Sequence, residues 1–208
     1  MHIVDVRRER TEDVVEYAAG VVFSGGTLLY PDETGYVVAC DPERTTAAAY
    51  VYEIAGGSIQ RLALCVASAA EMLEFAPENP LALLAAKRLL PGPVTLLLRR
   101  PSFLPGSDAP FDDRTGFRVP ADPLAHALLE RCGPLITSLT SYTGADLEGL
   151  PRAELLLERG EAPYAEPSIV DLTGERPRLR SVGAVSLERL TAGFGPMERA
   201  GTTPKIEP

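Results

Sequence analysis

The chain lacks tryptophan altogether and has only three cysteines and two histidines among its 208 residues. Cys40, Cys65 and Cys132 are odd in number and widely spaced, with only His2 and His126 to join them, so neither a disulfide framework nor a zinc site is predicted. No apolar run approaches the roughly 20 residues that span a bilayer, and the N-terminus lacks the apolar core of a signal peptide. We therefore expect a cytoplasmic protein with no membrane partner.

Positive charge is also scarce, because 20 lysines and arginines face 29 aspartates and glutamates, for a formal net charge of −9. Bulk nucleic-acid binding depends on clustered cations, so the charge does not favour RNA as a partner. A local basic groove stays open, since cations occur in pairs such as Lys87-Arg88 and Arg99-Arg100, and arginine makes fork-like contacts to phosphate or carboxylate. The alternative is that these pairs lie on solvated faces.

Four common catalytic motifs are missing from the chain. It contains no GxxxxGK[ST] phosphate loop, no GxGxxG, no HExxH and no GxSxG. The common nucleotide-binding folds and the simple hydrolases therefore lose weight as interpretations.

What is present is ordinary globular material, 45% hydrophobic and 24% charged, in a length that suits one domain over residues 1–195 with a tail over 196–208. Strands and helices intermix without a strict alternation, which predicts an α/β protein with a twisted mixed sheet flanked by helices. We expect strands at 2–6, 27–30, 36–40, 62–66, 94–98, 116–119 and 134–140, and a hairpin at 168–180. We expect helices at 11–23 with Thr11 as N-cap, at 41–54 opened by Asp41 and Pro42, and at 69–76, 79–90, 123–131, 151–159 and 186–192.

Polar side chains gather where several of these strands end. Asp32, Glu33 and Thr34 follow one strand, 137–141 carries hydroxyls, and Arg118 lies within another strand. Convergence of such groups at one sheet edge would make a pocket for an anionic ligand with a carboxylate or phosphate. The alternative is that the hydroxyls serve as turn and cap residues.

Six blocks in a fixed order resemble one known family. They are LLYPDETGYVVACDP (28–42), which is similar to YPTETVYG followed by GLGCDP, then LPGPVTLLL (90–98) to WPGPVT, GFRVPADP (116–123) to RVPxHP, CGPLITSLTSYTG (132–144) to GxPLxSTSANxSG, EPSIVDL (166–172) to PSTVVDL, and LRSVGAV (179–185) to LRxGAI. Together they resemble the YrdC-like family of threonylcarbamoyl-AMP synthases over roughly residues 10–190.

The resemblance implies a YrdC-like fold with an open cleft on one face. It also implies an enzyme that joins L-threonine, bicarbonate and ATP, with magnesium, into threonylcarbamoyl-AMP and pyrophosphate, for modification of tRNA. Members of the family are also described as double-stranded RNA binders.

The resemblance further assigns roles to individual residues. Arg118 would face an anionic ligand group, and Arg180 would close over phosphates with Ser168; these two arginines are the candidate catalytic residues. The candidate substrate-binding residues are Thr34, Tyr36, Ser138, Thr140, Ser141, Thr143 and Ser168.

The chain departs from the family pattern at the positions that carry positive charge. Ala55 and Gly57 stand where the family has its KxR motif, which implies a cleft stripped of cations and an activity that is weakened or lost. Asp32 replaces a threonine, Asp122 replaces a histidine, and Leu139 and Ser141 replace the second serine and the asparagine of STSAN.

The alternative interpretation of these departures is that another branch of the family runs the same chemistry with Arg61, Arg88 or Arg99 moved in. Three hypotheses stay open: an active or weakened synthase, a nucleotide- or double-stranded-RNA-binding paralogue without turnover, and an interaction protein that keeps only the fold.

Overall fold

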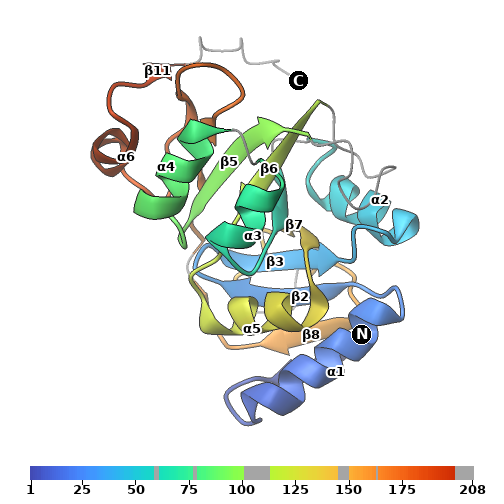
Figure 1. The fold of residues 1–208 in the computed structure, drawn as a ribbon. Helices are drawn as coiled ribbons and strands as arrows, with labels where there is room; N and C mark the ends of the chain where they lie inside the picture. The colour runs from blue at the N-terminus through green and yellow to red at the C-terminus, as the bar shows by residue number, and fades with distance from the viewer. Residues whose placement is uncertain (59–60, 77–78, 101–112, 145–149, 163, 200–208) are drawn as a thin grey trace, which may run out of the picture.

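A single twisted sheet runs through the computed structural model, which describes residues 1–58, 61–76, 79–100, 113–144, 150–162 and 164–199 (Figure 1). Its strand order is β1-β8-β2-β3-β7-β4-β6-β5-β9-β10-β11, and parallel and antiparallel neighbours alternate irregularly along it. The predicted mixed sheet is confirmed. The strands are β1 (His2–Asp5), β2 (Leu28–Asp32), β3 (Gly35–Cys40), β4 (Leu62–Cys65), β5 (Val94–Arg99), β6 (Arg114–Arg118), β7 (Leu135–Leu139), β8 (Leu155–Glu158), β9 (Ser168–Asp171), β10 (Arg178–Ser181) and β11 (Glu198–Arg199).

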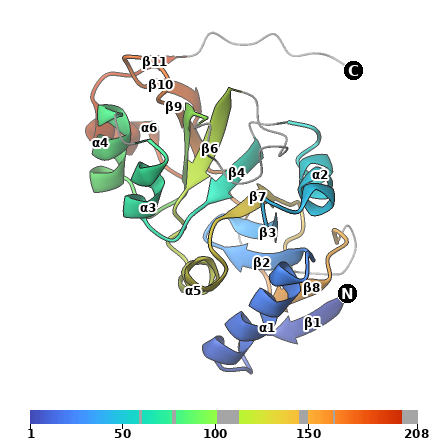
Figure 2. The ribbon, with the colours of Figure 1, turned by 45° about the vertical axis from the view of Figure 1, so that its right-hand side comes forward.

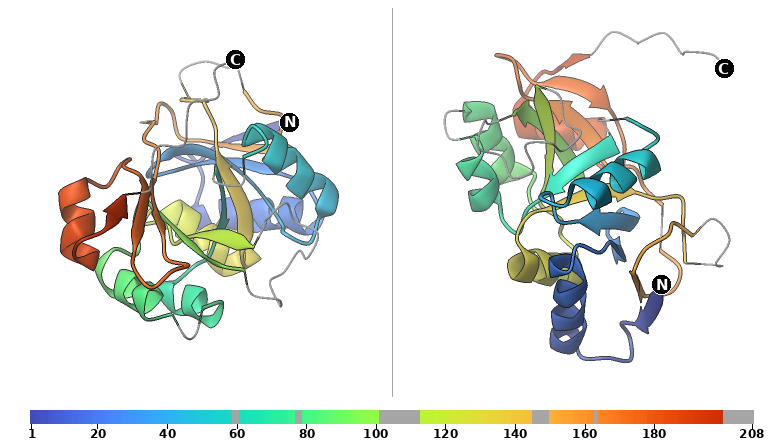
Figure 3. Two further views of the ribbon diagram at one scale, coloured as in Figure 1. Left: turned by 90° about the horizontal axis from the view of Figure 1, so that it is seen from above. Right: turned by 90° about the vertical axis from the view of Figure 1, so that its right-hand side faces the viewer.

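Helices cover the sheet unequally. Helices α1 (Thr11–Phe23) and α5 (Pro123–Cys132) pack together beside β2, whereas α2 (Thr45–Ile54) packs on β3 and β7 (Figure 2). Helices α3 (Ala69–Glu74), α4 (Pro80–Arg88) and α6 (Leu187–Phe194) form a group apart from α2 (Figure 3). Two hydrophobic cores result, one beneath α1 and α5 and one beneath the other four helices.

Several helix starts follow from side chains that accept backbone hydrogen bonds. Asn79 accepts from Leu81 and Ala82 ahead of α4, and Asp122 does the same for α5, each with proline at the start of the helix. Ser68 and Ser186 cap α3 and α6. These helices begin close to where the sequence predicts.

Two predicted helix starts are wrong. Arg10, not Thr11, is the N-cap of α1, and α2 begins at Thr45 rather than at Asp41. The Asp41 carboxylate instead accepts from the backbone N–H of Glu43 at 2.9 Å and lies 3.5 Å from Arg44 Nε. Asp41 therefore stabilises a turn that precedes the helix.

The prediction of a helix at 151–159 is wrong. Leu155 to Glu158 form β8, which pairs in parallel with both β1 and β2. Leu155 and Leu157 enter the core under α1 and α5 while Leu156 enters the other core, so the run is buried on both faces. Helix-forming residue types are overridden here by tertiary burial, as is usual for central strands.

The C-terminal segment is partly ordered by the sheet. Glu198 and Arg199, which lie within the tail predicted over 196–208, form β11, which pairs in parallel with β10. Residues 200–208 lie outside the described residues, as do residues 101–112, which lie in the Pro/Gly/Asp-rich loop expected between the strands at 94–98 and 116–119.

Strand alternation determines which side chains of the middle strands point to the face of the sheet opposite α2, α3, α4 and α6. Leu96 and Val170 belong to the core under α2, α3, α4 and α6, and their neighbours Thr95 and Ile169 point to the opposite face. Thr137 shares that face with Leu135 and Leu139, which contact the α1 and α5 core. The candidate site lies on this face.

Candidate functional site

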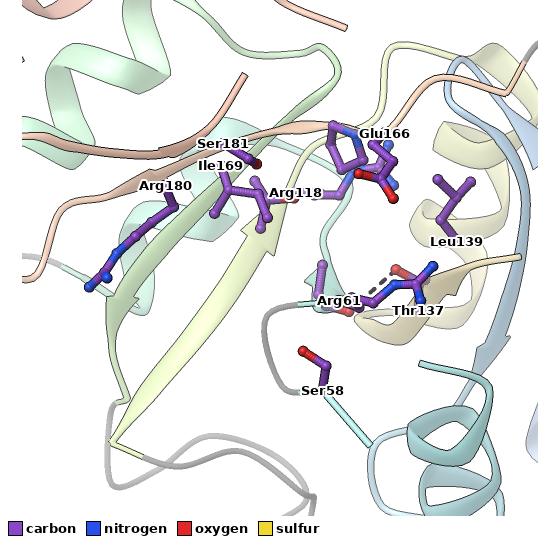
Figure 4. A pocket seen from close by; sticks show the side chains of 12 residues that line it. Ser58, Arg61, Arg118, Thr137, Leu139, Glu166, Ile169, Arg180 and Ser181 are labelled. Atoms are coloured by element: carbon purple, nitrogen blue, oxygen red, sulfur yellow. Dashed lines mark hydrogen bonds between the residues drawn. The ribbon is translucent and has the colours of Figure 1, made fainter. Parts of the chain in front are cut away.

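A cavity of about 310 Å³ lies against the middle strands of the sheet (Figure 4). Its size is at the lower end of the range for small-molecule sites, roughly 300–1,000 Å³. Strands supply its floor, the segment after α2 supplies one wall, and the chain entering β9 supplies another. It is lined by Ser58, Arg61, Ala63, Thr95, Arg118, Thr137, Leu139, Glu166, Pro167, Ile169, Arg180 and Ser181.

Arg118, the last residue of β6, is the buried cation of this pocket, with 3% of its surface exposed. Its Nη2 lies 3.0 Å from Asp32 Oδ2 and 3.7 Å from Glu33 Oε1. Burial opposes the charge on Arg118, but the carboxylates of Asp32 and Glu33 help to raise its pKa above the ordinary value. Arg118 therefore stays cationic and already has counter-charges from its own chain.

Asp32 also holds Thr34. Its Oδ1 accepts hydrogen bonds of 2.6 Å from both the backbone N–H and the hydroxyl of Thr34, and Arg118 Nη2 lies 3.4 Å from that hydroxyl. The three side chains form one buried unit, in which Thr34 donates to Asp32 and accepts from Arg118, and Asp32 forms an ion pair with Arg118.

Three buried polar atoms in this cluster have no hydrogen-bond partner among the described residues: the Tyr30 hydroxyl, Glu33 Oε1 and Arg118 Nε. Glu33 Oε2 accepts from the backbone N–H of Asp122 at 3.3 Å. Burial, followed by repulsion from Asp32, raises the pKa of the Glu33 carboxyl above its ordinary value. Since buried polar atoms are paired in most native folds, this unpaired set marks the cluster as a candidate binding site.

The segment after α2 carries the positions of the missing KxR motif. Ala55 is fully buried in the core, and Gly57 has a left-handed φ of 68°. Neither residue lines the pocket, but Ser58 and Arg61 just beyond them do. Burial raises the pKa of the Tyr164 hydroxyl, and the positive charge of Arg61 partly offsets that rise.

Arg61 changes the prediction of a cleft stripped of cations, because three arginines line the pocket: Arg61, Arg118 and Arg180. In Figure 4 the Arg61 side chain extends across the pocket toward Thr137 and Leu139. Arg118 and Arg180 are predicted site residues, so the prediction of a cleft stripped of cations is wrong only at Arg61, which the alternative interpretation moves in. The charge that remains depends on how each arginine is paired.

Arg180 is paired with Asp171, which is 2% exposed. Arg180 Nη2 and Nε lie 2.5 and 3.1 Å from Asp171 Oδ2, and Arg114 Nη1 lies 3.7 Å from the same oxygen. Burial alone would raise the pKa of Asp171, but hydrogen bonds from Thr173 and Arg180 lower it below the ordinary value. Arg180 points away from Arg61 and Arg118 (Figure 4).

The strand that carries Arg180 is irregular. LRSVGAV is one residue longer than LRxGAI, and the pairing of β10 with β9 shifts between Leu179 and Ser181. A β-bulge at this point accommodates one extra residue and changes the direction of side chains on the strand.

Comparison with known proteins places this geometry in a family. The family model described as "Telomere recombination", named for Sua5, YciO and YrdC, matches residues 21–181. The chain belongs to the Sua5/YciO/YrdC family. It is 31% identical to threonylcarbamoyl-AMP synthase of Nitrosococcus oceani over 167 residues, which cover 78% of this chain and 88% of that protein.

Two comparisons show similarity between this chain and a family member from Pyrococcus abyssi. Threonylcarbamoyl-AMP synthase of Pyrococcus abyssi is 27% identical over 210 residues, covering 93% of this chain but 61% of that protein's length. The crystal structure of Pyrococcus abyssi Sua5 complexed with L-threonine superposes with a TM-score of 0.82 at 25% identity, covering 96% of this chain and 63% of that one. The chain thus spans less than two thirds of this relative.

In the present chain, several hydroxyls that were predicted to bind ligand instead form hydrogen bonds with backbone groups of the protein itself. Ser168 donates to the carbonyl of Val185 and accepts from the backbone N–H groups of Gly183 and Val185. Tyr36 donates to the carbonyl of Gly160 and accepts from the N–H of Arg159. These two side chains fix the segments that border the pocket and do not line it.

The hydroxyls near the end of β7 are divided between interior and surface. Thr140 donates to the carbonyl of Tyr36 at 2.8 Å, and Ser138 lies 3.4 Å from the carbonyl of Leu139. Ser141 and Thr143 are exposed. The pocket is lined instead by Thr137 and Leu139 from this strand, so the predicted set and the lining set share few members.

Sequence reasoning missed two groups at the site. Glu166 lines the pocket, and the signal available was its place directly before the PSIVDL block. Arg159 makes a two-pronged contact with Asp122, at 2.5 Å to Oδ2 and 2.9 Å to Oδ1. No local pattern could have found that pair, because the two residues come from distant elements.

Two features are absent from the part of the chain that the structure describes. No helix there has the length and apolar character needed to cross a membrane. No group of three or more histidine, cysteine, aspartate or glutamate side chains is arranged to hold a metal ion there.

Proposed function

We propose that this chain carries out a slow form of threonylcarbamoyl-AMP synthesis, in which L-threonine, bicarbonate and ATP yield threonylcarbamoyl-AMP and pyrophosphate. The observation that carries the proposal is the pocket over Arg118, a buried cation linked to Thr34 and flanked by unpaired polar atoms. The similarity to a Sua5 structure solved with L-threonine supports a small amine substrate in this pocket.

The chemistry requires positioning more than covalent participation by the protein. The amine adds to the carbon of bicarbonate with loss of water to form a carbamate. A carbamate oxygen then attacks the α-phosphorus of ATP and displaces pyrophosphate. Such reactions are accelerated by holding the partners together and by stabilising the charge that develops. In this proposal Arg118 orients the substrate and Arg61, on the exposed rim, is the cation nearest an entering phosphate.

Charge balance is the reason for expecting a slow reaction. Against Arg61, Arg118 and Arg180 stand four carboxyl groups in or beside the pocket. A triphosphate entering such a site meets repulsion that a cation-rich cleft would not impose. These four carboxyl groups are Asp32, Glu33, Glu166 and Asp171. Binding of ATP with magnesium stays a prediction.

Pyrophosphate release tests the proposal. Purified protein with ATP and magnesium should release pyrophosphate only when L-threonine and bicarbonate are both present. Arg61→Gln should lower the rate about tenfold or more, because a charge-assisted contact contributes roughly 1.5–3 kcal/mol. Arg8→Gln, whose side chain is 82% exposed, is the control and should leave the rate unchanged. Absence of joint dependence at high protein concentration would remove the proposal.

A second candidate is a paralogue that binds a nucleotide or double-stranded RNA without turnover. Leu139 favours this second candidate, because its apolar side chain lines the pocket at the position where the family pattern has a serine. Calorimetry with ATP in the absence of other substrates tests nucleotide binding. Retention of duplex RNA that falls steeply with salt would indicate a phosphate-binding groove.

A further inference from the structure

The carboxylate of Asp32 contacts both Thr34 and Arg118, the two residues that the family resemblance assigns to ligand binding. One oxygen takes the N–H and hydroxyl of Thr34 at 2.6 Å, and the other lies 3.0 Å from Arg118 Nη2. The family pattern has threonine at this position, which cannot supply a negative charge. In this chain the carboxylate partner of Arg118 is therefore built into β2.

The built-in carboxylate changes which ligand charge the pocket accepts. A free amino acid would bring a second carboxylate toward Arg118, where it would meet Asp32 and also Glu33, 3.7 Å from the same guanidinium nitrogen. Glu166 adds a further carboxylate on the pocket wall. Like charges held close together at a partly buried site repel strongly, so a ligand without a carboxylate avoids this cost.

The unpaired atoms of the cluster define the hydrogen bonds that remain to be made. Arg118 Nε is a buried donor and Glu33 Oε1 a buried acceptor, both without a hydrogen-bond partner among residues that the structure describes. A neutral hydroxyl can accept from the first, and an amine N–H can be donated to the second. Leu139, Pro167 and Ile169 line the pocket as apolar surface for a short alkyl chain.

We propose that the preferred substrate class of this pocket is a small hydroxylated amine that lacks a free carboxylate, and that Asp32 is the residue that sets this preference. The inference rests on the reaction of the proposed function and makes L-threonine its poorer substrate, which agrees with a slow synthesis of threonylcarbamoyl-AMP. The amine would add to bicarbonate with loss of water to give a carbamate. The carbamate oxygen would then bond to the α-phosphorus of ATP as the bond to the β-phosphate oxygen breaks and pyrophosphate leaves.

Calorimetry without nucleotide tests the preference separately from turnover. Three ligands that share an amine and a hydroxyl are compared: L-threonine, L-threoninamide and 1-amino-2-propanol. The wild-type protein should bind the amide and the amino alcohol at least tenfold more tightly than L-threonine. Tighter binding of L-threonine, or no binding of any of the three, overturns the proposal.

Two variants assign the preference to Asp32. Asp32→Thr, which restores the family residue, and Asp32→Asn, which keeps the shape, should both shift the ratio of affinities toward L-threonine by about tenfold. The ratio is measured within each variant, so partial unfolding does not alter it. Thermal denaturation measures how far each variant is destabilised. An unchanged ratio in both variants would assign Asp32 a structural role only.

The outcome is distinguishable from failure of the proposed function. If the predicted order of binding holds but no amine supports pyrophosphate release, the ligand inference survives and the synthase proposal fails. If pyrophosphate is released with L-threonine in preference to the amino alcohol, the synthase proposal survives and the ligand inference fails.

Discussion

At the level of single residues, each of the two inner arginines of the pocket meets a carboxylate from another strand. Arg118 of β6 meets Asp32 of β2, and Arg180 of β10 meets Asp171 of β9. Since a buried ion pair is retained at a desolvation cost, breaking one partner leaves an uncompensated charge and destabilises the fold. These pairs hold strands together and at the same time set the charge of the pocket.

Asp171 provides a pH-dependent test of this dual role. Asp171→Asn should lower the free energy of unfolding by about 2 kcal/mol at pH 7, since hydrogen bonds to a charged group contribute roughly 1.5–3 kcal/mol. The fold lowers the pKa of Asp171, so its stabilisation is present above the ordinary value of about 4 and is lost as pH falls through the lowered pKa.

Urea unfolding at pH 7 and at pH 3 measures the Asp171 effect. The gap between wild type and Asp171→Asn should shrink in acid. Asp113→Asn, at a side chain 84% exposed, is the control and should change stability little at either pH. An equal gap at both pH values would show that the charge of Asp171 is not the source of its contribution.

Restoring the family's KxR cations is expected to fail in this chain. Ala55→Lys would place an ammonium group in the core and should cost about 3 kcal/mol or more, and Gly57→Arg would force a left-handed conformation that costs roughly 1–2 kcal/mol. The double variant should unfold at lower urea without faster pyrophosphate release. Glu53→Lys, exposed on α2, is the control. A gain in rate would show that this segment can turn into the pocket.

At the level of elements, the helix starts that depend on local capping side chains could be predicted from the sequence. Asn79 and Asp122 precede prolines and cap their helices, so α4 and α5 could be predicted to within a residue or two. The run Leu155–Leu157 was assigned to a helix because its residue types favour one, and only pairing with β1 and β2 makes it a strand. Local propensity cannot report a partner more than a hundred residues away.

The site was predicted less completely than the fold, for the same reason. Arg118 could be located because it lies inside a recognisable strand block. The pairing of Asp32 with Arg118, and the turn of Arg61 into the pocket, depend on how separate strands and loops meet. Hydroxyls such as Ser168 match a family motif yet are consumed by backbone groups.

The segment between β8 and β9 closely approaches the backbone of the segment that follows β7. A Cβ added at Gly144 would lie 2.1 Å from the carbonyl oxygen of Gly160, and Gly144 has a φ of 83°. Gly144→Ala should therefore destabilise the protein well beyond the roughly 1–2 kcal/mol of its left-handed conformation. Gly133→Ala is a matched control, with φ of 79° and nothing within 4 Å of the added atom. Equal losses in chemical denaturation would show that the contact with Gly160 gives way easily.

At the level of the whole molecule, one sheet separates two hydrophobic cores and belongs to both. Leu29 and Val38 enter the core under α2, α3, α4 and α6, while their neighbours Leu28 and Val37 enter the core under α1 and α5. Neither core can lose its sheet face without exposing the other, so we expect the two to unfold together in a single cooperative transition.

Two core variants test this coupling. Leu128→Ala, in α5, and Met72→Ala, in α3, each remove a fully buried side chain from a different core and should cost about 2–5 kcal/mol. If the sheet couples the cores, each variant lowers the midpoint seen by far-ultraviolet and by near-ultraviolet circular dichroism equally, since buried tyrosines report from both cores: Tyr36 from one and Tyr30 from the other. Each kcal/mol should lower the melting temperature by roughly 2–4 °C. Midpoints that separate in either variant would mean that one core opens while the other persists, and the pocket, whose floor is shared sheet, would then be lost before the protein unfolds.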